Sequence, residues 1–119
     1  MILADTSVWV AHLRAGDARL ARLLMKGSVA CHPFIIGELA CGSLGNRAEL
    51  LRLLAALPAC RVADHDEVMQ MIERRNLHSK GLGYVDVHLL ASALLTDVHL
   101  WTADLHLRTA ARTLRASYD

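Results

Sequence analysis

The chain opens with MILADTSVW (residues 1–9), and the pattern of a short apolar run followed by a helix signal recurs along its length. Residues 1–4 are apolar, and Asp5, Thr6 and Ser7 follow them directly. An apolar run without alternation is typical of a strand covered on both faces, and Asp, Thr and Ser are helix-capping residues. The opening therefore predicts a buried strand over 1–4 that passes into a short helix over 7–14.

Three more short apolar runs predict strands at 28–31, 60–63 and 98–101. The segments between them have apolar residues at helical spacing and typical end signals, including caps at Asp17, Asn46 and Asp104 and a cap at Asp64 or Asp66. The clearest helix is expected over 85–96, and the last over 104–115. Strands separated by helices pair in parallel through crossovers. The fold class expected is α/β, a three-layer α/β/α sandwich with a short parallel sheet.

Length and composition limit the organisation of the chain. Its 119 residues fit one domain spanning 1–119, and 54% hydrophobic residues exclude a disordered chain. No apolar run reaches the ~18 residues of a membrane span, and the first residues lack the positive charge of a secretory signal. The three cysteines have no Cys-x-x-Cys spacing. We therefore expect a cytoplasmic protein with no membrane partner, no disulfide framework and no thiolate zinc site.

Four of the twelve acidic residues stand in apolar surroundings. Asp5 and Asp104 follow the first and last expected strands, while Glu38 and Asp86 interrupt apolar helical segments. Ligands of open α/β sheets bind outside the carboxyl ends of the strands. If the first and last strands are neighbours, Asp5 and Asp104 face one crevice, and the helices bearing Glu38 and Asp86 can reach it.

Carboxylates buried together raise one another's pKa, and a divalent cation offsets that cost. Ligation by oxygen alone favours Mg²⁺ or Mn²⁺ over zinc, and such a site suits hydrolysis of a phosphodiester. Thr6, Ser7 and Thr102 are candidates for hydrogen bonds that hold the carboxylates. The competing interpretation is that each acid is simply a helix cap.

Four blocks in order resemble the PIN domain, specifically the VapC-type toxins of toxin–antitoxin pairs: LADTSVW (3–9), IGEL (36–39), GLGYVDVHLLASA (81–93) and LWTAD (100–104). The resemblance implies a metal-dependent endoribonuclease whose catalytic and metal-binding residues are Asp5, Glu38, Asp86 and Asp104. It implies that Asp5 and Asp86 contact the metal most directly. It also implies a VapB-type antitoxin as partner and a homodimer. Ala103 stands where many relatives carry a polar or basic residue.

The overall charge, 13 Lys and Arg against 12 Asp and Glu, does not by itself indicate a nucleic-acid partner. With the four acids set aside, 13 basic residues face eight acidic ones, which suits a phosphate backbone. The candidates for RNA-phosphate contacts are Arg74, Arg75, Lys80, Arg108 and Arg112. Tyr84 is the aromatic residue expected near the groove, with Trp9 and Trp101 in the core. Surplus leucines at 20, 24, 51 and 54 suit either a dimer interface or ordinary core.

Two alternatives stay open, and a third is set aside. A housekeeping RNA-processing PIN nuclease would have the same four acids but no antitoxin. A small α/β phosphohydrolase would use Asp5 as nucleophile, although position 7 is Ser where haloacid-dehalogenase-like enzymes have a second Asp. A non-catalytic binding module gives no reason for four acids in apolar surroundings. Histidine ligands are not expected, because no His-x-x-x-His pair stands on an expected helix and His88 points away from Asp86.

Overall fold

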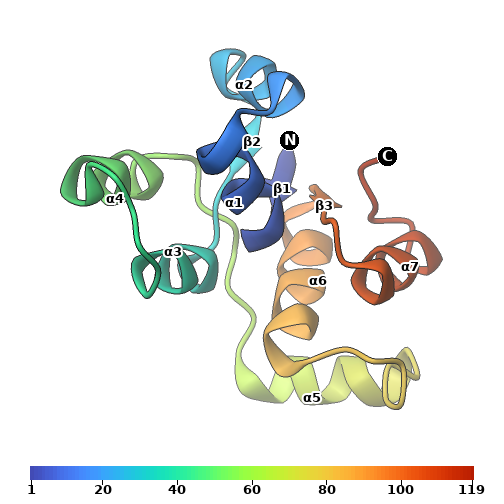
Figure 1. Cartoon of the computed structure of the whole chain (residues 1–119). Coiled ribbons are helices and arrows are strands. Elements are labelled where there is room, and N and C mark those ends of the chain that lie inside the picture. The colour runs from blue at the N-terminus through green and yellow to red at the C-terminus, as the bar shows by residue number, and fades with distance from the viewer.

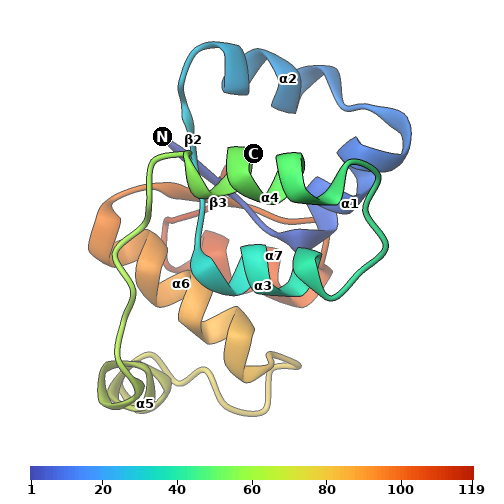
Figure 2. The ribbon, with the colours of Figure 1, turned by 90° about the vertical axis from the view of Figure 1, so that its left-hand side faces the viewer.

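The computed structural model describes residues 1–119 and contains seven helices and three strands. Their order is β1 (Ile2–Ala4), α1 (Thr6–Ala15), α2 (Ala18–Met25), β2 (Val29–Ala30), α3 (Pro33–Ala40), α4 (Arg47–Ala55), α5 (His65–Arg74), α6 (Tyr84–Thr96), β3 (His99–Trp101) and α7 (Leu105–Thr113). Helices α3 and α4 lie on one side of the strands and α7 on the other, in front and behind in the rotated view (Figures 1 and 2). The expected α/β class is confirmed.

The sheet is short and entirely parallel, with the strand order β2-β1-β3. Strand β1 pairs with β3 from Ile2 opposite His99 to Ala4 opposite Trp101. The first and last strands are therefore neighbours, as the position of Asp5 and Asp104 required. The carboxyl ends of β1 and β3 meet at one edge of the sheet, which is where ligands bind in open α/β folds.

The strand expected over 60–63 is wrong. Near it the chain makes only one bridge, from Ala59 to Cys31 beyond the end of β2, through the bonds Cys31 N–H to Pro58 O and Cys60 N–H to Cys31 O. The chain then leaves the sheet, because the Arg61 N–H donates to the Thr96 hydroxyl at the end of α6 over 2.9 Å. A side-chain acceptor has replaced the strand ladder at this point.

The core surrounds the central strand. Leu3, Ala4, Leu90, Ala93 and Leu100 are fully or almost fully buried. This burial explains why β1 is a continuous apolar run and why the middle of α6 is apolar on most of its faces. The leucines considered for a dimer interface belong to this core: Leu20 and Leu54 are buried, and Leu24 and Leu51 pack against it. They give no support to a dimer interface.

The starts of the helices explain how the sequence directs the chain. Asp17 accepts hydrogen bonds from two N–H groups of α2, and Asp64 closes a capping box with Glu67 at the start of α5. Asn46 precedes α4 in a left-handed conformation and makes no side-chain cap bond. Helix α3 begins at Pro33 behind His32, whose Nδ1 accepts from the Phe34 N–H over 3.0 Å. The caps therefore determine where most helices begin.

No helix is both long and apolar enough to cross a membrane. The three cysteines are free thiols. Cys31 and Cys60 are buried, and burial raises the pKa of the Cys31 thiol to about 11 and also raises that of Cys60. A thiol that stays protonated is a poor nucleophile and a poor metal ligand, so these cysteines act as core residues.

Candidate active site

A hydrogen-bond network joins the carboxyl ends of β1 and β3 around Asp5. The Asp5 N–H donates to the Trp101 carbonyl over 2.9 Å, which ties the two strand ends together. The Asp5 carboxylate accepts from the Ser7 hydroxyl over 2.5 Å and from the Val8 N–H over 3.3 Å at Oδ1, and from the Thr102 hydroxyl at Oδ2. Side chains from two ends of the sequence thus fix one carboxylate in orientation.

The donors around Asp5 are all neutral. Its side chain is buried, at 7% exposure, and the one ion pair of the protein joins Arg112 to Asp119. A carboxylate can accept about four hydrogen bonds, and the known donors account for three, two of them at Oδ1. Oδ2 therefore keeps a lone pair, and no basic side chain compensates the charge. This is the environment that a bound cation would complete.

The backbone of Asp104 is linked to Asp5 through the Thr102 hydroxyl. The Asp104 N–H donates to the Thr102 Oγ1 over 3.0 Å, and that same hydroxyl donates to Asp5. The Ala103 N–H donates to the Ser7 Oγ over 3.1 Å. The Asp104 carboxylate accepts from the Leu107 N–H over 2.8 Å as the N-cap of α7, and it is exposed. The predicted supporting residues Ser7 and Thr102 are therefore in contact with the site.

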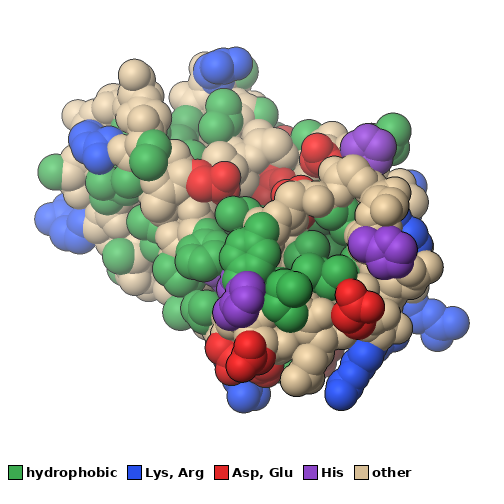
Figure 3. Space-filling model, turned by 90° about the horizontal axis from the view of Figure 1, so that it is seen from below, with side chains coloured by type: hydrophobic (Ala, Val, Ile, Leu, Met, Phe, Trp, Pro, Cys, Tyr) green, Lys and Arg blue, Asp and Glu red, His purple; other side chains and the backbone are tan.

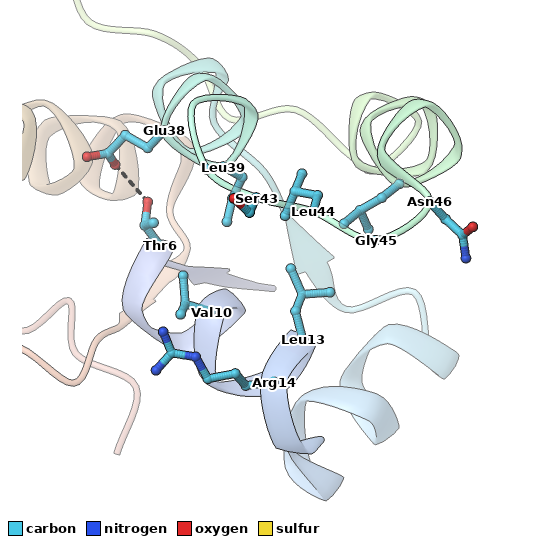
Figure 4. A pocket seen from close by; sticks show the side chains of 12 residues that line it. Thr6, Val10, Leu13, Arg14, Glu38, Leu39, Ser43, Leu44, Gly45 and Asn46 are labelled. Atoms are coloured by element: carbon cyan, nitrogen blue, oxygen red, sulfur yellow. Dashed lines mark hydrogen bonds between the residues drawn. The ribbon is translucent and has the colours of Figure 1, made fainter.

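Glu38 approaches the site from α3. It is exposed, and its Oε1 accepts from the Thr6 hydroxyl over 2.7 Å (Figure 4). Thr6 is the first residue of α1 and follows Asp5 directly. The single bond between Glu38 and Thr6 connects α3 to the strand end, and the supporting role of Thr6 stays a prediction.

Asp86 lies in the first turn of α6 and is half-buried. Its Oδ2 accepts from the Gly83 N–H over 2.9 Å, which closes the start of the helix. A Cβ at Gly83 would lie 3.7 Å from that oxygen, an ordinary van der Waals distance. Asp86 makes no hydrogen bond to the network around Asp5, so its place in the site depends on how α6 packs.

The surroundings of these acids differ from the expectation. Only Asp5 is buried, because Glu38 and Asp104 lie on solvated faces of their helices. Asp5, Asp86 and Asp104 each accept an N–H at a helix start, so the interpretation of these residues as caps also holds locally. Helix N-termini stabilise negative charge, which lowers the cost of placing several carboxylates at this edge.

The oxygen ligands of the four acids fit a hard divalent cation, but their side chains are not arranged around a common point. No three of the His, Cys, Asp and Glu side chains are arranged to share an ion. The four acids offer only oxygen ligands, which Mg²⁺ and Mn²⁺ prefer, and none of them has a basic partner. Asp5 would be the fixed ligand of such a site. The other three would adjust through their own side chains or through bridging water.

A pocket of about 490 Å³ extends from Glu38 and Thr6 between α1, α3 and the segment that leads into α4. Val10 and Leu13 of α1 line it and are partly exposed, at 36% and 41%. Figure 4 shows Leu13 and Leu44 on facing walls, and Arg14 extending from α1 beside Val10. The site therefore opens on one side into a largely apolar groove.

Two buried histidines lie between α3 and α6, and sequence reasoning missed the first of them. The His32 and His88 rings both pack edge-on against Phe34, with centroids 4.9 and 4.7 Å away. Burial and the neighbouring His88 lower the pKa of His32 to about 4, and burial and His65 lower the pKa of His88. Both rings are therefore neutral at pH 7. The signal for His32 in the sequence is its position before Pro33, a helix-start residue.

The aromatic residues differ in part from the expectation. Trp9 is buried as predicted, with its indole N–H unpartnered. Trp101 is only half-buried and packs against Tyr118 at the surface. Tyr84 is exposed, stacks edge-on against His88, and pairs its hydroxyl with His65 Nδ1 over 2.7 Å. It stands two residues before Asp86, and its place near the groove stays a prediction.

The five basic candidates separate into two groups. Arg74 and Arg75 line one shallow pocket, and Arg75 and Lys80 line another, and neither pocket contains any of the four acids. Arg108 and Arg112 share a pocket with Thr102, which contacts Asp5. Seen from below, several acidic side chains lie near the middle of the face, and Lys and Arg side chains lie around its rim (Figure 3). The pocket of Arg108 and Arg112 also contains none of the four acids, so only the link through Thr102 distinguishes the α7 arginines from the other three basic residues.

Known proteins resemble this chain over nearly its whole length. Residues 2–113 match the PIN domain family. Ribonuclease VapC32 of Mycobacterium tuberculosis, from strains CDC 1551 / Oshkosh and ATCC 25618 / H37Rv, is 51% identical over 111 residues, which cover 92% of this chain and 90% of the relative. The crystal structure of PAE2754 from Pyrobaculum aerophilum covers 95% of this chain and 85% of its own, with a TM-score of 0.61 and 18% identity. That last likeness supports the fold alone.

Proposed function

Since the chain belongs to the PIN-domain family and to its VapC-type ribonucleases, we propose that it is a metal-dependent endoribonuclease, the toxin of a type II toxin–antitoxin pair. It hydrolyses RNA phosphodiester bonds with Mg²⁺ or Mn²⁺ held by Asp5, Glu38, Asp86 and Asp104. The observation that carries this proposal is the Asp5 carboxylate, which is buried among neutral donors and keeps a free lone pair at the carboxyl ends of β1 and β3.

The roles of the residues follow from their contacts. Ser7 and Thr102 hold the Asp5 carboxylate in one orientation, and Thr6 does the same for Glu38. In the reaction a water oxygen loses a proton to solvent and bonds to phosphorus, while the bond from phosphorus to the leaving ribose oxygen breaks and that oxygen takes up a proton from solvent. A divalent cation, when bound, supplies a Lewis acid and lowers the pKa of water at the site. The carboxylates position the substrate phosphate by holding the positive charge that attracts it.

The decisive experiment is RNA cleavage by the protein purified free of antitoxin, with Mg²⁺ or Mn²⁺ and then with EDTA. Asp86→Asn removes one proposed ligand and keeps a side chain of the same shape. Asp66→Asn is the matched control, because Asp66 is an exposed residue in the first turn of α5 with no bond to the site. We expect cleavage by the wild type and by Asp66→Asn with metal, and none with EDTA or with Asp86→Asn. Cleavage that persists in EDTA or in Asp86→Asn contradicts the proposal.

The antitoxin belongs to the same proposal. Its place is the largely apolar groove next to Glu38, because a segment bound there would cover one edge of the site. Val10→Glu puts a charge on the exposed wall of this groove without touching the four acids. We expect the variant to cleave RNA but to release the co-expressed antitoxin. Retention of the antitoxin by Val10→Glu would place the partner elsewhere.

A homodimer is also proposed from the family. Light scattering on the purified protein measures the mass directly, and a mass of 13.1 kDa would show a monomer. The partner separates the toxin from a housekeeping RNA-processing nuclease, which would be isolated without an antitoxin. A phosphohydrolase with Asp5 as nucleophile is disfavoured, because position 7 is Ser where haloacid-dehalogenase-like enzymes have a second Asp.

A further inference from the structure

A second, polar pocket adjoins the site at Thr102, and it shares no lining residue with the apolar groove. It has a volume of about 250 Å³ and brings together three arginines from two helices, Arg19 of α2 and Arg108 and Arg112 of α7. Trp101, Tyr118 and Asp119 complete its walls. Three arginines around a small pocket repel one another unless an anion binds among them.

Aromatic rings hold Arg19 at this pocket. Its guanidinium lies 5.0 Å from the centroid of Trp101 and 5.7 Å from that of Tyr118, and the two rings pack 5.3 Å apart. Cation–π contacts of this kind place the guanidinium over the face of a ring. They use none of its N–H groups in a hydrogen bond, so these groups are left to bind an anion. Nothing in the sequence indicates this role for Arg19, because α2 lies far from Trp101 and Tyr118 along the chain.

Arg108 connects the pocket to the candidate active site. One of its terminal nitrogens donates to the Thr102 carbonyl over 3.4 Å, and the Thr102 hydroxyl donates to Asp5. A single residue, Thr102, would therefore connect an anion bound to Arg108 with the Asp5 carboxylate. Asp104, one turn before Arg108 on α7, forms no ion pair with it.

Arg112 already holds a carboxylate. Its Nε lies 3.2 and 3.3 Å from the two oxygens of Asp119, and a terminal nitrogen lies 3.2 Å from Oδ1. Ser117 donates to the same oxygen over 2.9 Å. These hydrogen bonds and the charges of Arg112 and Arg108 lower the pKa of Asp119. A carboxylate with two oxygens on an arginine fork has the geometry of a bound phosphate.

We propose that this pocket binds a phosphate group of the RNA strand adjacent to the one that is cleaved, through Arg19, Arg108 and Arg112, and that the Asp119 side chain occupies the phosphate position on Arg112 when no RNA is bound. The inference rests on the proposed function, because it assigns the same substrate to a neighbouring subsite. Binding of RNA then requires Asp119 to leave Arg112. Asp119 is exposed and held by few contacts, so this exchange disturbs little of the fold.

The test is the affinity for a short fluorescent oligouridylate, measured by anisotropy in EDTA over a series of salt concentrations. Arg112→Gln and Arg19→Gln should each weaken binding by about tenfold or more. Each should also reduce the slope of log affinity against log salt by about 0.7, the value for one phosphate contact on a single strand. Arg52→Gln is the matched control, because Arg52 is an exposed arginine of α4, on the other side of the molecule (Figure 1).

Asp119→Asn is expected to change the RNA affinity in the opposite direction. Removing the competing carboxylate should tighten binding by up to about fivefold, the range that an exposed ion pair permits. In the Arg112→Gln background the same change should have no effect, because the two residues act on one position. The proposal is overturned if Arg112→Gln and Arg19→Gln lose no more affinity than Arg52→Gln. It is equally overturned if Asp119→Asn binds RNA no more tightly than the wild type.

The RNA-binding test of the arginine pocket and the cleavage test of the nuclease can fail independently. Binding in EDTA requires neither metal nor cleavage, so its loss in the arginine variants reports on the arginine pocket independently of the nuclease. Cleavage that fails while the arginine variants bind more weakly would contradict the nuclease and keep the phosphate pocket. Cleavage that depends on Asp86 while the arginine variants bind normally would keep the nuclease and overturn the pocket.

Discussion

The candidate site has two halves that are built differently. At the strand ends, Asp5 is buried and held by three donors, two of them hydroxyls, from residues nearly a hundred positions apart in sequence. On the helix side, Glu38 and Asp86 are more exposed, and each has one hydrogen bond. The sheet therefore provides one rigidly oriented carboxylate, while the helices provide two whose position depends on how α3 and α6 pack.

The packing between α3 and α6 is aromatic. Phe34 of α3 lies between His32 and His88, and Tyr84 of α6 packs against His88 on its other side. The histidine nitrogens Nε2 of His32 and Nδ1 of His88 are buried without partners. Neutral rings fill this interface, and their protonation would introduce charge between the helices that carry Glu38 and Asp86. The two halves therefore differ in the burial of their carboxylates and also in the contacts that position them: hydrogen bonds at the strand ends and aromatic packing between the helices.

Asp5→Asn is the strongest test of the strand-end half. The change is nearly isosteric and keeps the N-cap of α1, but it removes the negative charge that would hold a cation. We expect RNA cleavage to fall by about a hundredfold or more, as for other groups that stabilise the transition state directly. The melting temperature should change little.

Asp17→Asn is the matched control for this change, because Asp17 caps α2 in the same way and has no contact with the site. Equal cleavage by the wild type and Asp5→Asn would show that Asp5 is only a helix cap.

Thr102→Val tests whether the orientation of Asp5 matters. The variant keeps the shape of the side chain but removes the hydroxyl that donates to Asp5 and accepts from the Asp104 N–H. We expect cleavage to fall by about 10–100-fold, the usual effect of removing a group that orients a ligand. Thr109→Val serves as the comparison, since the Thr109 hydroxyl bonds only to the Leu105 carbonyl within α7. A similar loss in both variants would assign the effect to stability instead.

Glu38→Gln tests the helix half. This side chain has one bond and is exposed, so we expect a smaller loss of cleavage at limiting Mg²⁺, about tenfold, with recovery as Mg²⁺ is raised. Glu49→Gln, on an exposed position of α4, should behave as wild type. A loss from Glu38→Gln that Mg²⁺ does not reduce would mean that Glu38 acts by something other than holding the cation.

The buried histidines predict an acid-sensitive fold. The pKa of His32 is lowered from 6.5 to about 4, so the unfolded chain binds a proton more readily than the folded one. Stability should be fully present above pH 6.5 and fall as the pH drops toward 4, by at most about 1.4 kcal/mol per pH unit for this group. Unfolding by urea at several pH values measures the slope. His32→Asn keeps the cap acceptor and should flatten it, whereas an unchanged slope would assign the acid sensitivity to other groups.

Much of the fold could be predicted from local patterns. The runs at 1–4 and 98–101 form neighbouring parallel strands, and caps at Asp17, Asp64 and Asp104 start the helices expected. The prediction of a strand over 60–63 is wrong, because an apolar run does not specify the hydrogen-bond partner of its backbone. The Arg61 N–H donates to the Thr96 hydroxyl instead of to a neighbouring strand. The expectation that all four acids are buried is wrong because apolar neighbours in sequence lie on other faces of a helix, as at Glu38.

The sequence by itself determined the α/β class and the order of all elements except the strand expected over 60–63, and it proposed the four acids, because these depend on short-range periodicity, capping and motif order. Only the tertiary structure decided that Asp5 is the one buried acid, that Thr102 orients it, and that Arg19 joins Arg108 and Arg112 around Asp119. These contacts join residues far apart along the chain. The parallel pairing of β1 with β3 and the packing of α2 and α7 beside Trp101 are what bring them together, and no local pattern encodes those distances.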